Sequence, residues 1–418
     1  MTRSPTIVNV VDVVTLGESM VTFLPTRPGR LADVPSFERA IGGAESNVAC
    51  VLAALGHSTR WVSRVGADGF GDHLVARIAG YGVDTGSVRT DPARPTGVYF
   101  RTAADRATDA HEVAYYRAGS AASAMSVTGT DLTAARAGRV LHLSGITAAL
   151  SPQCLELMRE LTAPRPGRPL ISFDVNHRPG LWAAADGAGV LLELARDADL
   201  VFVGEDEAEH AWGVTGGPAA IRALLPEPAL LVVKQAAQGA TAFARDDAGE
   251  LLRPAAGGPA AGAADATRPE RSGERGGAGR DRTAPAPSPA SVPRRATAPH
   301  TFEPAPLTFE PAPPALEPAP HTFEPAPHVD VVAPVGAGDA FAAGFLSATL
   351  RGLPVKHRLR YGHLMAAAAL TTPADLATPP GRGHADRLAA LDDEAWGRLR
   401  LGPGWTQAER APEEANTP

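Results

Sequence analysis

The residues best suited to chemistry lie late in the chain, in Gly336-Ala337-Gly338-Asp339, which follows a predicted short strand at Val329–Val332 and opens a predicted helix that runs to about Leu350. Three small residues at a helix start let backbone N–H groups approach an anion, and the helix dipole adds partial positive charge there. Asp339 falls in the first turn, so its carboxylate can face the same cleft. This pattern fits phosphoryl transfer, with amides stabilising the phosphate and Asp339 accepting the proton of the attacking hydroxyl. An ordinary glycine turn and helix cap fit the same spacing.

A second glycine turn, Gly42-Gly43, precedes a predicted helix whose first turns carry Glu45 and Asn47. Glycine allows a ligand to approach the backbone closely. Gly43 and Asn47 are therefore candidates for contacts to the hydroxyl groups of a ligand. A glycine turn that only starts a helix explains the same residues.

Aromatic residues and an arginine occur together in two strand-like segments, with Tyr99 in the first and Tyr115-Tyr116-Arg117 in the second. Because side chains alternate along a strand, Tyr115 and Arg117 share a face. A guanidinium group binds a carboxylate through two hydrogen bonds, so this pair suits an acidic ligand. The alternative is an amphipathic strand with a solvated arginine.

Polar residues follow two further strand-like segments. Asp174-Val175-Asn176-His177-Arg178 ends one of them, at the carboxyl end where open α/β sheets bind ligands. Glu205-Asp206-Glu207 follows the next strand, and Glu207 is a candidate to hold Mg²⁺ through water. A polar turn and an acidic helix start are the corresponding alternatives. The histidines show no metal-ligand spacing.

The elements that must position these residues alternate between strand and helix. Short apolar runs, typical of buried parallel strands, occur at Val11–Leu16, Val140–Leu143, Leu170–Phe173, Leu200–Val203 and Leu230–Lys234. Helical stretches lie between them, at Glu45–Leu55, Pro152–Leu161, Ala188–Ala195 and Pro218–Leu225. This alternation predicts an α/β fold with a doubly wound, mostly parallel sheet and helices on both faces. Met20–Leu24, Gly97–Thr102 and Glu112–Arg117 break the rhythm, and we expect them in a small antiparallel sheet.

The excess of glycine and proline lies mainly between Arg253 and His328, and its last part is a repeat of seven residues. The copies begin at His300, Leu307, Pro314 and His321, and each carries at least two prolines, which excludes a coiled coil. The composition predicts a disordered insertion over 254–328 with extended, polyproline-like repeats. Two interpretations stay open for repeats 300–327, namely a protein partner that binds their phenylalanines and a low-complexity insertion without a partner.

The composition restricts the class of protein. The 418 residues carry a net charge of -7, which argues against a coat for nucleic acid or anionic membrane. No run approaches the roughly 20 apolar residues of a membrane helix, and the N-terminus lacks a signal-peptide pattern, so we expect a cytoplasmic protein. Cys50 and Cys154 exclude a disulfide scaffold and are expected as buried free thiols.

Taken together, the motifs resemble those of the ribokinase-like (PfkB-type) carbohydrate kinases. Gly42–Leu55 is similar to the first signature of this family, and Pro334–Leu346 to the second. Within the family, the motifs are most similar to those of kinases for 2-keto-3-deoxygluconate, a sugar acid. The segments that carry this similarity are Gly42–Ala49, Pro95–Phe100, Tyr115–Ser123, Leu141–Pro152, Ser172–Trp182 and Val335–Leu346. The resemblance covers roughly residues 10–250 and 329–400.

The resemblance implies a kinase domain over 1–253 and 329–405, with a β-sheet lid from about 20–40 and 95–118 and a flexible tail over 406–418. It implies that Asp339 is the catalytic base and that the amides of Gly336, Ala337 and Gly338 form an anion hole. The residues implied for the sugar acid are Gly43, Asn47, Tyr99, Tyr115, Arg117, Arg178 and Asp375. Those implied for the nucleotide are Lys234, Gly239, Gly336 and Gly338, with Mg²⁺ held near Glu207.

Three positions depart from the family pattern. Ala333 stands where relatives usually have an aspartate that helps hold a monovalent cation, so the sequence lacks that ligand. Gly204 replaces an asparagine of the motif that ends in Glu207, and Ala236 replaces a glycine beside the nucleotide.

We therefore expect an ATP-dependent kinase that phosphorylates the terminal hydroxyl of a sugar acid, with ATP and Mg²⁺ and with neither nucleic acid nor membrane as a partner. Two alternatives stay open, a kinase for a neutral sugar such as fructose and an impaired kinase fold that acts as a binding module through its repeats. Self-association into a homo-oligomer is also left open.

Overall fold

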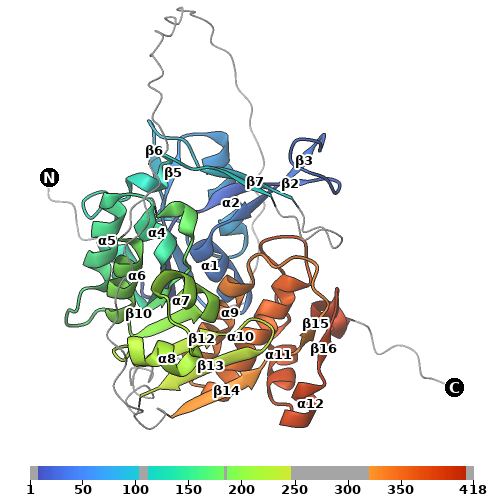
Figure 1. Cartoon of the computed structure of the whole chain (residues 1–418). Coiled ribbons are helices and arrows are strands. Elements are labelled where there is room, and N and C mark those ends of the chain that lie inside the picture. Colours follow the sequence, from blue (N-terminus) through green and yellow to red (C-terminus); the bar gives the residue numbers. More distant parts are fainter. Residues whose placement is uncertain (1–7, 103–111, 183–185, 246–319, 411–418) are drawn as a thin grey trace, which may run out of the picture. The chain divides into compact units, whose positions relative to one another are not determined.

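The computed structural model describes residues 8–102, 112–182, 186–245 and 320–410, and these residues belong to one compact unit. An eight-stranded sheet runs through this unit, with helices on both sides (Figure 1). Its strands, in spatial order, are β14 (His321–Pro325), β13 (Gly239–Ala244), β12 (Leu230–Lys234), β11 (Leu200–Gly204), β10 (Leu170–Asp174), β9 (Gly138–Ser144), β1 (Val11–Leu16) and β4 (Thr59–Val62).

The direction of the strands divides this sheet into two parts. All neighbours from β4 to β12 are parallel, and β13 and β14 are antiparallel additions at one edge. The parallel strands need helical crossovers, which the predicted alternation of strands and helices supplies. The doubly wound, mostly parallel sheet is therefore confirmed.

Helices cover both faces of the sheet, so a central strand such as β11 is apolar and buried on both sides. In β11, Leu200 and Phe202 pack into one core, and Val201 and Val203 pack into the other. The first core includes helices α1 (Ala44–Ala54), α9 (Ala337–Leu350), α10 (Val355–Leu370), α11 (Arg382–Ala389) and α12 (Asp393–Gly397). The second includes α3 (Leu132–Arg136), α4 (Gly145–Ala149), α5 (Pro152–Thr162), α6 (Gly187–Arg196), α7 (Glu205–Trp212) and α8 (Gly217–Leu224).

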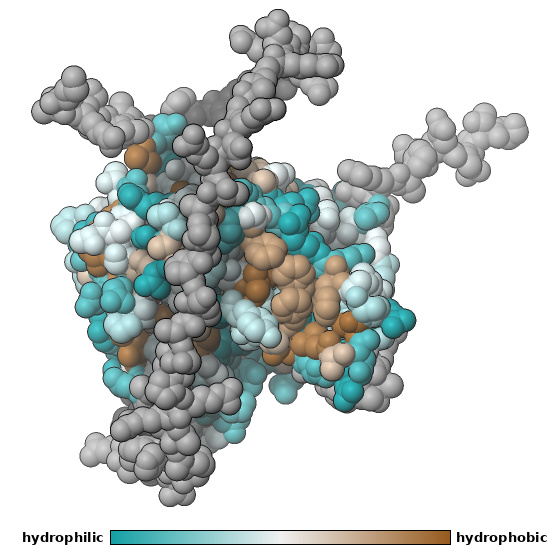
Figure 2. Space-filling view, turned by 90° about the horizontal axis from the view of Figure 1, so that it is seen from above, coloured by the Kyte–Doolittle hydropathy of each residue, from teal (hydrophilic) through white to brown (hydrophobic). Residues whose placement is uncertain are grey.

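A small separate sheet stands beside the carboxyl ends of these strands, as expected, but it is not wholly antiparallel, because Val21–Phe23 pairs in parallel with Val98–Phe100. Its order is β3 (Phe37–Gly42), β2 (Met20–Pro25), β7 (Val98–Arg101) and β8 (Val113–Tyr116). Phe23 stacks on Phe100, with ring centroids 4.7 Å apart, and Phe37 meets Phe100 edge-on at 5.2 Å. Figure 2 looks down on the side of the molecule that carries this sheet, and hydrophobic surface gathers there.

The remaining elements connect these parts. They are β5 (Arg64–Gly66), α2 (Gly69–Gly80), β6 (Arg89–Asp91), β15 (His328–Val329) and β16 (Arg400–Leu401), with short 3-10 helices η1 (Ala122–Ala124), η2 (Pro179–Leu181) and η4 (Trp405–Arg410). Cys50 and Cys154 are buried free thiols, as expected. Among the described residues, no helix is long and apolar enough to cross a membrane.

The expected insertion is wrong at its end, because residues 321–325 form strand β14 in the central sheet. Proline is tolerated there, since Pro325 is the last residue of an edge strand. The rest of the predicted disorder, residues 254–319, lies outside the described residues.

Two other boundaries also change. The expected strand Val329–Val332 shrinks to β15, which pairs with β16, because the N–H groups of Val332 and Ala333 donate to Leu370 O instead. The expected tail begins too early, since η4 continues from Trp405, whose ring lies 5.9 Å from that of His384.

Candidate active site

A cavity of about 830 Å³ lies at the carboxyl ends of the central strands, under the small sheet. The predicted site residues that line it are Gly43, Asn47, Tyr99, Tyr115, Arg117, Arg178, Glu207, Lys234, Gly336, Gly338, Asp339 and Asp375. The fold thus brings together residues from both ends of the chain.

The start of α9 forms the floor of this cavity. Gly336 caps the helix with φ 78°, a left-handed conformation that favours glycine. A side chain there would also meet the backbone, since a Cβ would lie 2.2 Å from Asp375 O. The first backbone N–H groups of a helix have no partner within it, so this helix start offers donors to an anion.

Asp339 lies in the first turn of α9 and lines the cavity. Burial, together with the nearby carboxylates of Asp174 and Glu45, raises the pKa of its carboxyl to about 7, although a hydrogen bond from Asn47 lowers it. Asn47 Nδ2 donates to Asp339 Oδ2 at 3.0 Å. A carboxylate with a pKa near neutrality is suited to general-base catalysis.

Lys234, at the end of β12, supplies a cation beside the start of α9. Its Nζ lies 3.1 Å from Asp174 Oδ1 at the end of β10, and 3.6 Å from the position of a Cβ on Gly338. Burial by itself would lower the pKa of Lys234, but the carboxylates of Asp174 and Glu207 raise it overall. Lys234 therefore stays charged and can face an anion bound at the helix start.

Glu207 lies in the first turn of α7, where its Oε2 accepts a hydrogen bond of 2.8 Å from Gly204 N. The described residues contain no group of three or more acidic, histidine or cysteine side chains that could hold a metal ion. Mg²⁺ often binds through one or two carboxylates, waters and nucleotide phosphates, without a protein cage. Glu207 and the buried, unpartnered Oδ1 of Asn176 both line the cavity and fit that kind of site.

Asp375 lies in the segment after α10, as expected, and meets two residues of β7. Tyr99 OH donates to Asp375 Oδ2, and Arg101 Nε donates to Asp375 Oδ1 at 2.8 Å. The side chains of Arg101 and Asp375 are 2% and 3% exposed. Arg101 is a site residue that the sequence analysis missed, and the alternation Tyr99–Arg101 on one strand face was the available signal.

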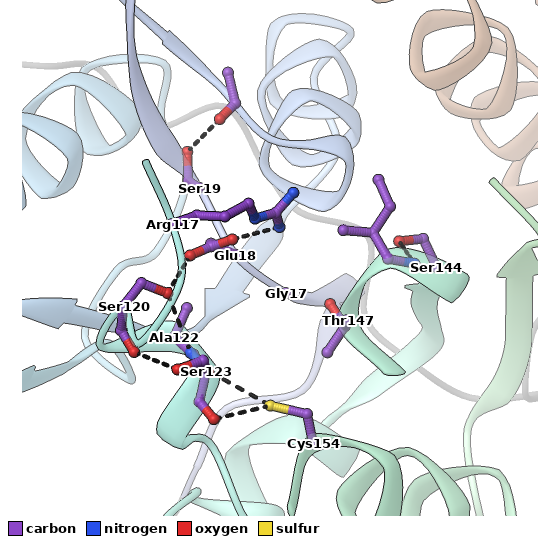
Figure 3. A network of polar contacts seen from close by, with 12 residues as sticks. Gly17, Glu18, Ser19, Arg117, Ser120, Ala122, Ser123, Ser144, Thr147 and Cys154 are labelled. Atoms are coloured by element: carbon purple, nitrogen blue, oxygen red, sulfur yellow. Dashed lines mark hydrogen bonds and ion pairs between the residues drawn. The ribbon is translucent and has the colours of Figure 1, made fainter. Parts of the chain in front are cut away.

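Arg117 has a partner within the protein. Figure 3 shows its guanidinium group pointing at Glu18, with which it forms an ion pair, and Glu18 in turn accepts a hydrogen bond from Ser120. The network continues to Ser123, whose backbone oxygen lies 3.6 Å from Cys154 Sγ. The interpretation of Arg117 as a solvated or uncompensated cation is wrong, because the buried Glu18 balances its charge. Its Nε is nevertheless buried without a hydrogen-bond partner.

Arg178 and Tyr115 lie at the rim of the cavity. Arg178 is exposed and forms no ion pair with any described residue, and its charge lowers the pKa of Asp339. Tyr115 is 54% exposed, and its ring lies 5.4 Å from that of Tyr99. Arg178 is therefore a cation available to an acidic ligand.

The glycines at the start of α1 allow close packing. A Cβ on Gly43 would lie 2.5 Å from Glu18 O, and one on Gly42 would meet Tyr99 OH and Asp375 Oδ2. Glu45, in the first turn of α1, is fully buried, and Ser144 and Thr147 donate to its Oε1 at 2.7 and 2.9 Å.

Two predicted nucleotide or anion-hole residues are not brought to the cavity lining. Ala337 lies in the first turn of α9 without contributing to the lining. Gly239 packs under β14, where a Cβ would lie 2.3 Å from Glu324 O. The absence of a side chain at Gly239 allows β13 and β14 to pair closely. The geometry therefore does not support the expected contact with the nucleotide.

Comparison with known proteins covers most of the chain. The profile of the "pfkB family carbohydrate kinase" matches residues 11–263 and 319–380. The 2-dehydro-3-deoxygluconokinase of Bacillus subtilis (strain 168) is 36% identical over 205 residues, which span 48% of this chain and 63% of that protein, less than two thirds of its length.

The chain is also similar to a kinase named for another sugar and to a solved structure of the same fold. Fructokinase-1 of Oryza sativa subsp. japonica is 32% identical over 243 residues, 57% of this chain and 75% of that protein. A putative ribokinase II of E. coli, solved in complex with ATP and Mg²⁺, is 19% identical with a TM-score of 0.65, and the superposition covers 90% of this chain and 98% of that one. That likeness shows the fold.

Proposed function

Because the chain belongs to the pfkB family of carbohydrate kinases, we propose that it transfers the terminal phosphate of ATP to the terminal hydroxyl of a sugar acid, with 2-keto-3-deoxygluconate as the first candidate. The observation that carries this proposal is the position of Asp339. Its carboxyl lies at the start of α9, in the same cavity as Lys234, and its pKa is raised to about 7.

In this proposal, different residues of the cavity carry out different parts of the reaction. Asp339 accepts the proton of the sugar hydroxyl, and Asn47 holds its carboxylate in place. The amides at the start of α9 and the ammonium group of Lys234 stabilise the charge of the phosphate in transfer. Mg²⁺ bound with the nucleotide near Glu207 and Asn176 would neutralise further phosphate charge.

The sugar lies under the small sheet in this proposal. Tyr99 and Tyr115 from the small sheet and Asp375 from the segment after α10 line the cavity and offer hydrogen bonds to hydroxyl groups. Arg178 supplies the positive charge for a carboxylate, because it has no counter-ion among the described residues. Arg117 also lines the cavity, and its buried Nε–H has no hydrogen-bond partner.

A neutral sugar such as fructose is the second candidate, and one observation favours it. Glu18 already balances the charge of Arg117, so the cavity contains one uncompensated arginine rather than the expected two. A neutral ligand then leaves only the exposed Arg178 without an anion, and exposed charges are well solvated.

The test is release of ADP in a coupled assay across sugars and sugar acids, on the parent and on Arg178→Met. For an acidic substrate the KM should rise by about 10-fold or more in the variant, since a charge-assisted hydrogen bond contributes on the order of 1.5–3 kcal/mol. The KM for a neutral sugar should stay unchanged. Turnover on neutral sugars alone, or an equal effect of Arg178→Met on both classes, would contradict the assignment of a sugar acid.

A further inference from the structure

The outer strand of the central sheet is one copy of a sequence that occurs more than once in the chain. Residues 321–327 read His-Thr-Phe-Glu-Pro-Ala-Pro, and β14 is their first part. Residues 300–306 read the same, and residues 307–313 differ only by Leu307 at the first position. The described part of the chain contains the last copy alone.

Contacts to its backbone hold β14 in a groove formed by the edge of β13, Arg360 and Trp396. The strand pairs antiparallel with β13, with Phe243 opposite His321 and Gly239 opposite Pro325. The missing side chain of Gly239 gives room to Glu324 O and Pro325, which a Cβ would approach to 2.3 and 2.9 Å. Trp396 Nε1 donates to Pro325 O at 2.9 Å. These contacts fit an extended peptide of this length.

The groove also recognises one side chain, Glu324, which is 4% exposed. Arg360 Nε donates to Glu324 Oε2 at 2.9 Å, and Lys356 Nζ lies 3.6 Å from Oε1. Arg360 is itself 2% exposed and lies over the ring of Trp396, 4.8 Å from its centroid. Arg360 Nη2 also donates to Asp393 Oδ1 at 2.6 Å, but the Asp393 side chain is 75% exposed, so Glu324 is the buried acid that compensates the buried guanidinium group. Every copy of the repeat has that acid, at Glu303, Glu310, Glu317 and Glu324.

We propose that the edge of β13, with Arg360 and Trp396, is an acceptor groove for the chain's own repeats, in which residues 300–306 exchange with residues 321–327. An identical sequence satisfies each contact in the same way. Because the two copies present the same side chains to β13, the strand pairing itself does not select one copy over the other. When residues 300–306 pair with β13, residues 307–327 become part of the connection that leads from this strand to His328.

The exchange leaves the segment that leads to Gly336 in place, because hydrogen bonds hold this segment after the end of β14. His328 N donates to Leu399 O at 3.0 Å, and Val332 N donates to Leu370 O at 2.7 Å. These bonds fix the chain ahead of Gly336 whichever copy lies beside β13. The exchange closes one additional loop, over 307–327, which disfavours it, so residues 321–327 are the main occupant. Removing Glu324 removes that advantage and shifts the population to another copy.

A set of glutamate variants tests this proposal by thermal melting of the full chain. The variant with all four changes, Glu303→Ala, Glu310→Ala, Glu317→Ala and Glu324→Ala, removes the buried acid beside Arg360 and leaves it with the exposed Asp393, so it should lose roughly 5–15 °C of melting temperature. Glu324→Ala alone should lose clearly less, because residues 300–306 supply a replacement. The control that keeps Glu324 and changes the other three should melt like the parent. Equal losses in Glu324→Ala and in the fourfold variant would overturn the exchange.

Cysteine trapping shows the exchange directly. Thr241 faces Phe323 in the register, so Thr241→Cys with Phe323→Cys should form a disulfide, as the positive control. In the Glu324→Ala background, Thr241→Cys with Phe302→Cys should cross-link within one chain. Thr241→Cys with Thr301→Cys is the matched control on the wrong face and should stay reduced. Absence of the Phe302→Cys cross-link, or its formation only between two chains, would contradict exchange within the molecule.

Discussion

At the scale of single residues, Asp339 combines two properties that a general base needs. Its pKa is raised to about 7 by burial and by neighbouring carboxylates, and Asn47 fixes its orientation. A base near neutrality is largely available at physiological pH and still accepts a proton readily. This places the proposed chemistry on one side chain that can be replaced without a change of size.

Asp339→Asn should lower kcat by about 10²–10⁴-fold, because an amide cannot accept the hydroxyl proton. Sugar binding, measured by calorimetry, should survive. In the parent, kcat should rise with pH through about 7 as the carboxyl ionises. Asp131→Asn, at the cap of α3 and outside the cavity lining, is the matched control and should keep parent turnover. A near-normal kcat in Asp339→Asn would remove the base from the mechanism.

Glu45 is a second carboxyl of unusual proton affinity. Burial raises its pKa to about 7, which hydrogen bonds from Ser144 and Thr147 only partly offset. Its folded-state pKa lies above the ordinary value of 4.5. The native state therefore holds this proton more tightly than the unfolded chain, and the resulting stability is present below pH 4.5 and is lost as pH rises through about 7.

Glu45→Gln should consequently be more stable than the parent above pH 8, by roughly 3 kcal/mol at most, because it removes a buried charge and keeps the acceptor for Ser144 and Thr147. The measurement is the melting temperature of both proteins from pH 5 to pH 9. The exposed Glu38→Gln serves as the control and should follow the parent. Parallel curves for Glu45→Gln and the parent would show that Glu45 ionises normally.

At the scale of elements, two buried ion pairs connect the lid to the main domain. Arg101 on β7 meets Asp375 after α10, and Arg117 after β8 meets Glu18 after β1. Arg101 Nη2 also donates to Pro373 O at 2.8 Å. Since Asp375 O lies against Gly336, the first pair links the lid to the start of α9.

Arg101→Met should destabilise the fold by about 3–5 kcal/mol, because it leaves the buried Asp375 without its cation. It should also raise the KM for every accepted sugar, since Asp375 loses its fixed position in the cavity. In the double variant Arg101→Met with Asp375→Asn no charge stays buried, and much of the stability should return while the KM stays high. Chemical denaturation and kinetics of the two variants check this, and full recovery of the KM would contradict a positioning role.

At the scale of the whole molecule, the connection between β13 and β14 carries the long segment rich in glycine and proline. The two strands are hydrogen-bonded neighbours, with Phe243 opposite His321, so their ends lie close enough for a hairpin turn. The composition of residues 254–319 predicts few contacts with the domain. The segment that can be removed without loss of a strand ends before His321, and not at residue 328, because residues 321–325 belong to the sheet.

Replacing residues 254–319 by a short Gly/Ser turn should leave melting temperature and turnover unchanged or slightly raised, because loop closure costs only about 0.6 kcal/mol per doubling of length. A longer replacement, of residues 254–327, also removes β14 and exposes Arg360. That variant should melt clearly lower. If the shorter replacement already melts far below the parent, residues 254–319 pack on the domain and the compositional prediction is wrong.

Local sequence patterns are sufficient to predict the layered fold and the part of the site at the start of α9. The strands at Val11–Leu16 and Leu230–Lys234 and the helix after Gly336 follow from local patterns, since apolar runs, glycine turns and caps act over a few residues. Asp339 could be placed beside the expected anion hole in the same way, because it directly follows Gly336–Gly338 in the sequence.

Which charges are compensated, and which copy of the repeat forms a strand, follow from contacts between residues that are distant in the chain. Glu18 lies far from Arg117 in the chain and Asp375 far from Arg101, and no local pattern announces such pairs. Gly239 looked like a nucleotide contact and turned out to accommodate β14. Residues 300–306 and 321–327 are identical, so the sequence cannot distinguish them. The last copy forms β14 because it directly precedes His328, which donates to Leu399 O, so no additional loop has to close.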